Sequence, residues 1–581
     1  MSTALRVHDL DPAVRVAPRW RDSAYAPVAV AVVLSAALQT VWLRFMATSG
    51  GDIAAQDAWA EFARLHPGSA YDLAWYGGMH PVSYSAISPF VMAGIGVRTT
   101  MVLTSVVAAA LLAWLVTHRM ARGGSRLVVA GVGALALLGN AVSGRVTFAL
   151  GTTVALAAVC VVTAWPSPRA GRSRLARGVL AATLAATATA CSPVAGLFLG
   201  VVAAALWLRR RWAAAYALGV PAVAVVAAST LLFPFSGRQP MSWTSAVLPA
   251  ALAVAVALLA PRGWREVRTG AGVYLVMVVL VWLVPTPIGS NVTRLGLLFG
   301  GVALVAVALS GRWRGSAVAR RLGAPAAAAL LATAIVTSLG WQVSIAGHDA
   351  LRSRPPTALD TDLAPLVARL RAAGPVVGRV EVVPTRSHRE AAALASYVPL
   401  VRGWNRQADV QRNPLFYGSG RVDATTYHHW LRRWAVQYVV LATTAAPDFG
   451  AGAEARLVGG GLPYLHVIWS DPTWTLYAVR RPASLVRPVA TVTSFDADQL
   501  TVTTPAAGRY VVKVATSPWL SLVDADGRAS GIGCLTDLDS ERPTSTGRAR
   551  TDDWVVLRAP AAGTYRIAAP YRLPRGSRCA A

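Results

Sequence analysis

The residues of this chain that are best suited to chemistry are concentrated in positions 50–64, which read GGDIAAQDAWAEFAR. Asp52 can begin a helix, because its side chain accepts hydrogen bonds from the first unpaired backbone N–H groups. In that helix Asp57 and Glu61 share a face, four residues apart, with Arg64 beside them. Neighbouring carboxylates raise one another's pKa towards values useful for a general base. At least one of these acids is therefore expected to have a function; the alternative is an amphipathic surface helix with Asp52 as a simple cap.

The distribution of acids along the chain strengthens this expectation. Residues 24–347 contain five acids, and four of them lie in the first long loop: Asp52, Asp57, Glu61 and Asp72. The fifth is Glu266. Because an ionised carboxylate is costly in or beside hydrocarbon, acids that are retained in one loop of an apolar chain point to binding or catalysis.

The same loop continues with DLAWYGGMHP at residues 72–81. The aromatic rings of Trp75 and Tyr76 offer flat faces that suit sugars, and the two glycines allow a tight turn beside them. We expect Trp75, Tyr76 and His80 to bind substrate. The alternatives are a membrane-interface anchor for the aromatic residues and, for His80, a structural hydrogen-bonding role, which is favoured over metal ligation.

Arginines in three further short loops are candidates for anion binding. They are Arg145, Arg238 and Arg294, and Asn291 lies beside the last of them. If these loops face outwards, their positive charge runs against the usual topological bias. A phosphate or diphosphate on a lipid carrier would satisfy their guanidinium groups. The alternative is contact with ordinary phospholipid headgroups.

Beyond the apolar region, residues 402–407 read RGWNRQ. We predict that Arg402, Trp404 and Gln407 bind a polar ligand; a packed seam between domains is equally compatible with this composition. The consecutive residues His428 and His429 are poorly placed for a metal, because neighbouring helical positions diverge and no third ligand is evident.

The elements that position these residues are membrane helices. The chain is 55% hydrophobic, and its 55 basic residues against 27 acidic ones give a net charge of +28. Arginine clusters punctuate the apolar runs, which indicates membrane topology and not nucleic-acid binding. Apolar runs of suitable length predict eleven transmembrane helices. Their ranges are 24–46, 99–117, 127–144, 146–165, 179–191, 193–208, 212–233, 243–260, 271–285, 295–310 and 323–345.

This pattern predicts a multi-pass plasma-membrane protein with residues 1–23 as a cytoplasmic segment and the C-terminal domains outside. Residues 24–347 form the transmembrane domain, and 48–98 form its first outside loop. Two places are ambiguous. Residues 179–208 are short for two spans, so a single tilted helix competes with a hairpin broken near Pro193, and residues 81–97 are expected to be juxtamembrane or re-entrant.

After Gly347 the acids return, and the pattern changes to that of soluble domains. Residues 348–483 predict an α/β domain, with helices near 362–373, 386–397 and 424–434 and strands near 376–383 and 436–442. Residues 484–581 predict a β-sandwich-like domain with strands near 500, 510, 554 and 564. If this tail is exported, Cys534 and Cys579 are expected to form a disulfide, with two unpaired thiols as the alternative.

With these residues in hand, the chain resembles GT-C-type membrane glycosyltransferases of actinobacteria, and especially a membrane-domain family named for a relation to pyruvoyl-tetrahydropterin synthase. The resemblance rests on the acid-bearing first loop, on GSNVTR at 289–294, and on VVPT at 382–385 with RGWNRQ at 402–407. The chain departs from the GT-C pattern because it lacks an adjacent pair of acids in the first loop.

This resemblance implies transfer of a sugar from a polyprenyl-phosphate donor to an envelope glycan or lipid acceptor, with inversion. By position it makes Asp52 the base and Asp57 a second, orienting or metal-assisting acid, so that a divalent metal is possible but no cofactor is certain. The expected partners are the lipid-linked donor, the acceptor and the bilayer, with no nucleic acid. The alternatives are a membrane transporter or lipid flippase and a noncatalytic envelope scaffold.

Overall fold

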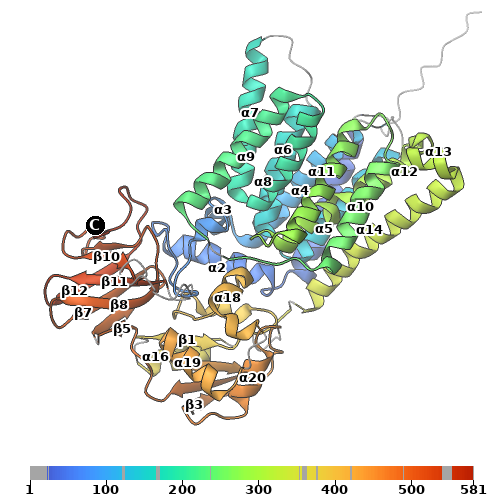
Figure 1. The fold of residues 1–581 in the computed structure, drawn as a ribbon. Coiled ribbons are helices and arrows are strands. Elements are labelled where there is room, and N and C mark those ends of the chain that lie inside the picture. Colours follow the sequence, from blue (N-terminus) through green and yellow to red (C-terminus); the bar gives the residue numbers. More distant parts are fainter. Residues whose placement is uncertain are drawn as a thin grey trace, which may run out of the picture.

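The computed structural model describes residues 23, 25–118, 120, 125–164, 171–235, 237–352, 354–355, 363–374, 377–418, 422–488, 490–538 and 553–579. Apart from Ser23, the predicted cytoplasmic segment 1–23 lies outside the described residues. A bundle of helices occupies one half of the molecule, and two domains that contain β-sheets lie together at one end of it (Figure 1).

Each of the eleven predicted spans coincides with a helix or with consecutive helical segments. The bundle consists of α1 (Ala26–Val41) with η2 (Trp42–Met46), α4 (Val97–Thr117), α5 (Ser125–Val142), α6 (Val146–Thr163), α7 (Gly171–Cys191), α8 (Pro193–Leu208), α9 (Trp212–Leu232), α10 (Trp243–Leu259), α11 (Arg265–Leu283), η4 (Gly289–Thr293), η5 (Gly296–Gly300), α12 (Gly301–Leu309), η6 (Arg312–Gly315), α13 (Ala317–Leu322) and α14 (Ala324–Arg352).

Many of these helices can cross a membrane. Within the described part of the chain, eight helical segments are long and apolar enough to do so, and α8 and α10 are apolar but shorter. Many of their large apolar side chains are exposed, as expected for a surface that faces lipid. The protein is therefore a multi-pass membrane protein.

The ambiguous region near residue 191 contains two helices. α7 ends at Cys191, Ser192 has extended backbone angles, and α8 begins at Pro193. The predicted hairpin is therefore present, and the single tilted helix is not. Two full helices fit because α7 begins at Gly171, inside the preceding arginine cluster and eight positions before the predicted start.

The first long loop lies across the end of the bundle that faces the two sheet-containing domains (Figure 1). It forms α2 (Asp52–Leu65), η3 (Pro81–Ser83) and the short helix α3 (Ser88–Ile95). α3 is too short to cross a bilayer, which agrees with the expected juxtamembrane or re-entrant segment. The helix predicted after Gly50-Gly51 is confirmed, with Asp52 as its first residue. Its N-cap is Gly51, without a side-chain capping hydrogen bond, so the predicted cap role of Asp52 is wrong.

The first of the two sheet-containing domains is an α/β unit. Its sheet has the order β1-β2-β4-β3, in which β1 and β2 are parallel and the other pairs are antiparallel. The elements are α16 (Ala364–Ala372), β1 (Arg379–Val382), α17 (Arg389–Leu394), α18 (Arg406–Arg412), η7 (Pro414–Phe416), α19 (Ala424–Trp434), β2 (Val436–Ala442), α20 (Gly452–Gly459), β3 (Leu465–Ser470) and β4 (Trp474–Val479).

The second unit has two antiparallel four-stranded sheets, with orders β10-β11-β8-β5 and β6-β7-β12-β9. Side chains from both sheets share one apolar core, so the sheets form a sandwich. A disulfide joins Cys534 to Cys579. The strands are β5 (Val486–Arg487), β6 (Thr491–Phe495), β7 (Gln499–Thr504), β8 (Gly508–Ala515), β9 (Ser521–Val523), β10 (Cys534–Asp537), β11 (Trp554–Ala559) and β12 (Gly563–Ala568).

Arg402 lies at the centre of a buried ionic cluster in the α/β domain. Its guanidinium is 2.7 Å from Asp409 and 2.8 Å from Glu454, and Glu381 lies 4.0 Å away. Neither carboxylate oxygen of Glu381 has a hydrogen-bond partner among the described residues. Burial, and then the charge of Glu454, raise the pKa of Glu381 well above its usual value. The charge balance of the cluster therefore favours the neutral form of Glu381 beside the Arg402 cation.

This balance predicts opposite effects for two substitutions. Arg402→Met should destabilise the domain by about 3–5 kcal/mol, because it leaves buried carboxylates without a cation. Glu381→Gln should stabilise it at neutral pH, because the amide replaces a group that ionises more readily in the unfolded chain. Since the folded pKa of Glu381 is raised, wild-type stability should fall as the pH rises from the unfolded pKa towards the folded one. Thermal unfolding in detergent across this range measures both effects, and a destabilised Glu381→Gln protein would contradict the assignment.

Candidate functional site

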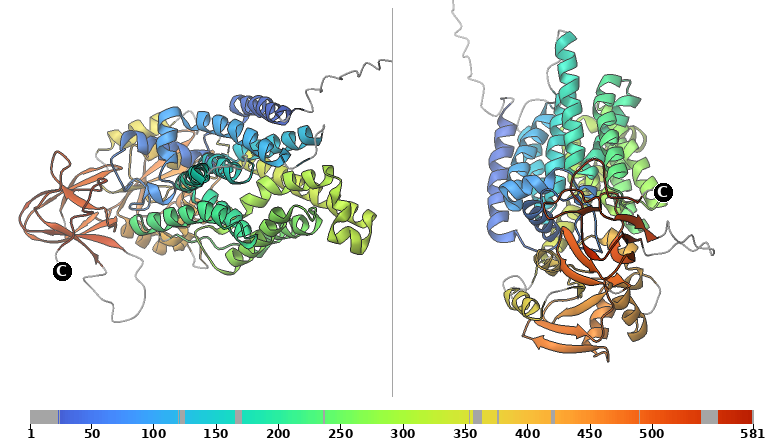
Figure 2. Two further views of the ribbon diagram at one scale, coloured as in Figure 1. Left: turned by 90° about the horizontal axis from the view of Figure 1, so that it is seen from above. Right: turned by 90° about the vertical axis from the view of Figure 1, so that its left-hand side faces the viewer.

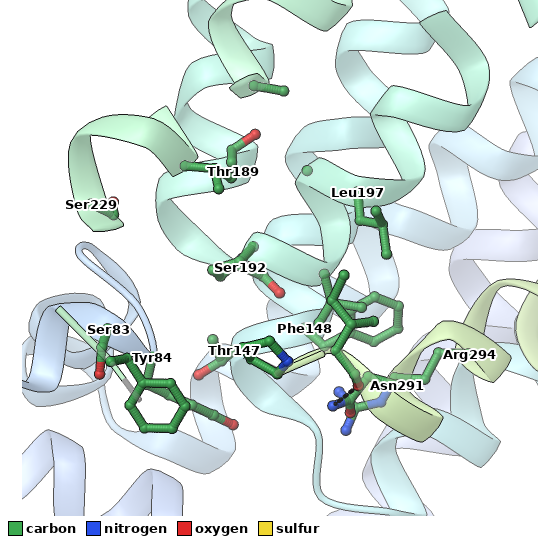
Figure 3. A pocket seen from close by; sticks show the side chains of 18 of the residues that line it. Ser83, Tyr84, Thr147, Phe148, Thr189, Ser192, Leu197, Ser229, Asn291 and Arg294 are labelled. Atoms are coloured by element: carbon green, nitrogen blue, oxygen red, sulfur yellow. Dashed lines mark hydrogen bonds between the residues drawn. The ribbon is translucent and has the colours of Figure 1, made fainter. Parts of the chain in front are cut away.

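A cavity of about 1570 Å³ opens between the helix bundle and the α/β domain. One end is polar and lies where α2, η4 and the α/β domain meet, and the rest runs between α8 and α9. In Figure 3, Tyr84 and Thr147 lie on one side of the polar end, and Asn291 and Arg294 lie on the other. Ser192, which precedes α8, and Leu197 of α8 lie above them.

At the polar end Asp52 faces two arginines. Its Oδ2 lies 3.6 Å from Nε of Arg145 and 3.8 Å from a terminal nitrogen of Arg294. Arg145 also contacts Asp349 at 3.1 Å, and the Arg294 guanidinium lies over the Phe148 ring. Nε of Arg145 is buried and has no hydrogen-bond acceptor within the described structure. Both arginines line the cavity, and a pair of guanidinium groups is a suitable partner for an anionic ligand.

The Asp52 side chain keeps 26% of its surface exposed, and it lines the cavity. Burial raises the pKa of its carboxyl above the usual value, although the positive charges of Arg294 and Arg145 act in the opposite direction. A carboxylate in this environment is a better proton acceptor than an ordinary surface aspartate, because its basicity increases with its pKa.

The position of Asp52 is fixed by the glycine before it. Gly51 has φ 64° and ψ −139°, a combination that essentially only glycine adopts. Its N–H donates to the Ser387 carbonyl at 2.7 Å, and its own carbonyl accepts from Nε1 of Trp404 at 2.8 Å. Gly144 packs so closely that a Cβ there would lie 2.9 Å from the backbone nitrogen of Ile53. The start of α2 is thus held by both the bundle and the α/β domain.

One helical turn after Asp52, Gln56 connects two residues of the cavity wall. Its amide nitrogen donates to the Tyr84 hydroxyl at 2.9 Å, and its amide oxygen accepts from the Thr147 hydroxyl. The Tyr84 ring also makes an edge contact with Trp404. Two aromatic rings with adjacent hydroxyl groups form a surface that suits a sugar ring.

The α/β domain supplies the opposite wall of the polar end. His388 lies 3.6 Å from Asp448 through Nε2, while its buried Nδ1 has no hydrogen-bond partner in the described part of the protein. Asp448 also accepts from Arg406 at 2.7 Å. Although burial acts to raise it, the contacts with His388 and Arg406 hold the pKa of Asp448 well below its usual value. Asp448 is therefore an ionised partner that orients the His388 ring.

The remaining wall of the cavity is apolar. Along α8 and α9 it is lined by small and aliphatic side chains, with Trp207 and Tyr216 at the far end. The α8 part from Pro193 to Trp207 has a length of about 21 Å at 1.5 Å per residue. The cavity therefore joins a charged end to a long apolar groove between two membrane helices.

The structure brings six of the predicted site residues to this cavity. They are Asp52, Arg145, Asn291, Arg294, Trp404 and Gln407. Gln239 connects the loop at 402–407 to the loop at 289–294: Gln407 donates to Gln239 at 3.1 Å, and Gln239 donates to Ser290 at 3.1 Å.

The other predicted site residues lie elsewhere. Asp57 is paired with Arg98 and does not line the cavity. Arg238 is exposed and also lies outside the cavity lining. Arg402 is 3% exposed and belongs to the ionic cluster of the α/β core, so its guanidinium cannot reach a ligand. Its predicted substrate-binding role is replaced by a structural one.

The aromatic residues of the first loop also have structural positions. Trp75 and Tyr76 are fully buried in the core that the loop shares with the α/β domain. His80 is buried, with Nδ1 against the Ala70 carbonyl and Nε2 against the Ser517 hydroxyl; burial lowers its pKa to about 4. These residues join the first loop to the later domains, and they do not contact the cavity.

Two cavity residues that sequence reasoning did not select are His388 and Asp448. Each follows its strand by six residues, β1 for His388 and β2 for Asp448. Because these strands are parallel and adjacent, their carboxyl ends share one edge of the sheet. The alternation of strands and helices could therefore have indicated this pair. The residues described here include no group of three His, Cys, Asp or Glu side chains that could hold a metal.

Comparison with known proteins identifies one family over part of the chain. Residues 487–581 match a family described as a domain of unknown function (DUF8823). This match covers the β-sandwich and does not extend to the helices. The resemblance to the pyruvoyl-tetrahydropterin-synthase-related family therefore stays a prediction. No curated protein matches the chain.

Several solved structures have partial similarity to this chain, and three of them are as follows. The archaeal oligosaccharyltransferase AglB from Archaeoglobus fulgidus, in complex with an inhibitory peptide and a dolichol-phosphate, gives a TM-score of 0.43 at 11% identity, covering 72% of this chain and 69% of its own. The arabinofuranosyltransferase AftD from Mycobacteria gives a TM-score of 0.45 at 15% identity, covering 93% of this chain and 59% of its own. ArnT from Cupriavidus metallidurans gives a TM-score of 0.42 at 15% identity, covering 78% of this chain and 97% of its own. At these values the similarity assigns neither a family nor an activity.

Proposed function

We propose that the protein is a membrane glycosyltransferase that moves a sugar from a polyprenyl-phosphate donor to a glycan or lipid acceptor of the cell envelope. The observation that carries this proposal is the shape of the cavity, which joins an Asp–Arg cluster to an apolar groove of about 21 Å along α8. A lipid-linked phosphate has the same division into an anionic head and a long apolar chain. The end of the bundle that carries α2 then faces the outside of the plasma membrane, and the N-terminus is cytoplasmic.

The charged groups have separate roles in this reaction. Arg294 and Arg145, whose side chains both line the cavity, bind the donor phosphate. The acceptor hydroxyl oxygen attacks the anomeric carbon, and Asp52 takes the hydroxyl proton. The bond between that carbon and the phosphate oxygen breaks, and the lipid phosphate leaves with the electron pair. The two arginines stabilise the negative charge that this step leaves on the phosphate.

The α/β domain supplies the acceptor side of the site. The free Nδ1 of His388 can accept a hydrogen bond from an acceptor hydroxyl, because Asp448 holds the ring through Nε2. Trp404 and Tyr84 offer the sugar-binding rings beside it. A backbone hydrogen bond joins Gly51 to Ser387, the residues directly before Asp52 and His388. Asp52 and His388 are therefore close together, and an acceptor bound here lies between them.

Replacing Asp52 by Asn tests the catalytic assignment. The rate of sugar transfer in membranes, measured with radiolabelled polyprenyl-phosphate sugars, should fall about 100-fold or more, the usual contribution of a general base. The wild-type rate should increase as the pH rises through the raised pKa of Asp52. Asp57→Asn is the matched control, because Asp57 lies in the same helix but outside the cavity, and it should remain close to wild type. Full activity of Asp52→Asn would exclude Asp52 as the base, and donor binding without any transfer by wild type would favour a lipid carrier.

The lipid groove is tested at Gly200 of α8, which lines the cavity and has open space around the position of a Cβ. Gly200→Phe should fill the groove without disturbing the fold, and so weaken binding of a long-chain polyprenyl phosphate about tenfold or more, as expected when the buried apolar area of the ligand is lost. Gly178→Phe in α7 is the control, since Gly178 has similar free space but does not line the cavity. Thermal stabilisation by added lipid phosphate measures the binding. Equal stabilisation of the two variants would contradict the groove assignment.

The acceptor role is tested at His388. His388→Gln should lower the transfer rate about tenfold, which corresponds to the loss of one hydrogen bond to the reacting group. It should leave thermal stabilisation by the lipid phosphate unchanged, because His388 lies on the acceptor side. His429→Gln, at an exposed position of the same domain, is the control. A parallel loss of lipid-phosphate binding in His388→Gln would show that His388 does not act on the acceptor.

A further inference from the structure

The β-sandwich contacts the end of a membrane helix through an aromatic and arginine cluster. Nε1 of Trp519 donates to the Leu232 carbonyl at 2.7 Å, and Arg575 donates to the same oxygen at 3.2 Å. Leu232 is the last residue of α9, one of the helices able to cross the membrane. Phe233 stacks on Trp519 with ring centroids 5.1 Å apart. These contacts place this face of the sandwich at the level where α9 leaves the bilayer.

The segment that contains Arg575 has the composition of a membrane-surface anchor. Residues 571–579 read YRLPRGSRC and carry three arginines and no acid. Leu573, the third residue of this segment, is 78% exposed, and Leu231 at the end of α9 is 76% exposed. Tyr571 contacts both Phe233 and Trp519 at the same place. Aromatic rings, an exposed aliphatic side chain and basic residues together suit the boundary between headgroups and acyl chains.

The fold holds this segment in place at three points. The Tyr571 N–H donates to the Gly68 carbonyl of the first loop, Arg575 is bound to α9, and the disulfide ties Cys579 to β10. Between these points Leu573 has no packing role in the sandwich core. Both Figure 1 and the right-hand view of Figure 2 place the β-sandwich at the same end of the helix bundle as the α/β domain.

We propose that residues 571–578 form a lipid-binding loop that inserts Leu573 into the membrane surface and binds anionic lipid phosphates through Arg572, Arg575 and Arg578. Its partner is the bilayer around α9, and the argument for that partner is continuity with the end of a membrane span and charge complementarity. The loop would hold the β-sandwich against the membrane and fix the end of α9, whose residues Ser229 and Thr230 line the cavity. The proposal does not depend on the enzymatic activity proposed above.

The test uses the full chain in lipid nanodiscs with an environment-sensitive fluorophore at Leu573→Cys. The native thiols Cys160 and Cys191 are buried in the bundle and provide the labelling background. The emission should shift to the blue, and lipids carrying a nitroxide near the headgroup should quench it. Val467→Cys in β3 (Figure 1) is the matched control, because Val467 is also an exposed aliphatic residue but lies on the far sheet edge of the α/β domain. Its fluorophore should show neither effect.

The contribution of charge is measured by comparing phosphatidylglycerol-containing nanodiscs with pure phosphatidylcholine. Each arginine near an anionic surface should favour the inserted state about fivefold, so quenching at position 573 should be weaker in phosphatidylcholine. Arg572→Gln in the phosphatidylglycerol nanodiscs should change quenching in the same direction. A fluorophore at Tyr571→Cys provides a second position in the loop. Emission and quenching at 573 and 571 that equal those at 467 would overturn the proposal, and equal quenching in the two lipids would overturn the role of the arginines.

Discussion

The site depends on how the first residues of α2 are held. Asp52 can face Arg145 and Arg294 only if the chain turns sharply before it, and Gly51 makes that turn with a backbone conformation that other residues avoid. Both backbone polar groups of Gly51 are bound by the α/β domain, through Ser387 and Trp404. The carboxylate is therefore positioned by backbone contacts and not by its own hydrogen bonds. This leaves its oxygens available to a substrate and its charge compensated only at longer distances.

Because the α/β domain holds Gly51, neither half of the protein contains the whole site. The bundle supplies the apolar groove and the two arginines, while the α/β domain supplies His388, Asp448 and Trp404. A displacement of the domain would move the Asp52 carboxylate and the opposite wall together. The first loop makes such a displacement costly, since Trp75 and Tyr76 are buried in the shared core and Tyr71 donates to the Ala515 carbonyl of the sandwich. The buried contacts of Trp75, Tyr76 and Tyr71, which do not line the cavity, thus set the geometry of the residues that line it.

The sequence indicated the helices and part of the site. Apolar runs placed the membrane helices because hydropathy is a property of a continuous segment. The helix beginning at Asp52 was predicted from Gly50-Gly51 and an acid at its start, although Gly51 and not Asp52 is the N-cap. Arg294 and Trp404 were predicted as site residues from their residue type, and both line the cavity. Trp75, Tyr76 and Arg402 were predicted on the same grounds, but they are buried in the core. Residue type gives the chemistry that a side chain can perform, but only tertiary packing decides whether a ligand can reach it. The α8–α9 groove was missed because its small and aliphatic side chains are those of any membrane helix.

The contrast between Arg402 and Arg145 shows what separates a structural charge from one that can bind a ligand. Both arginines are largely buried and lie beside carboxylates. Arg402 is surrounded by acids and hydrogen-bonded to Asp409 and Glu454, so an added anion would meet a site that is already neutralised. Arg145 also pairs with carboxylates, at 3.6 Å from Asp52 and 3.1 Å from Asp349, but its side chain lines an open cavity beside a second arginine, Arg294. A ligand in the cavity can therefore meet two guanidinium groups. Two adjacent cations give the polar end of the cavity a physical preference for a phosphate beside Asp52.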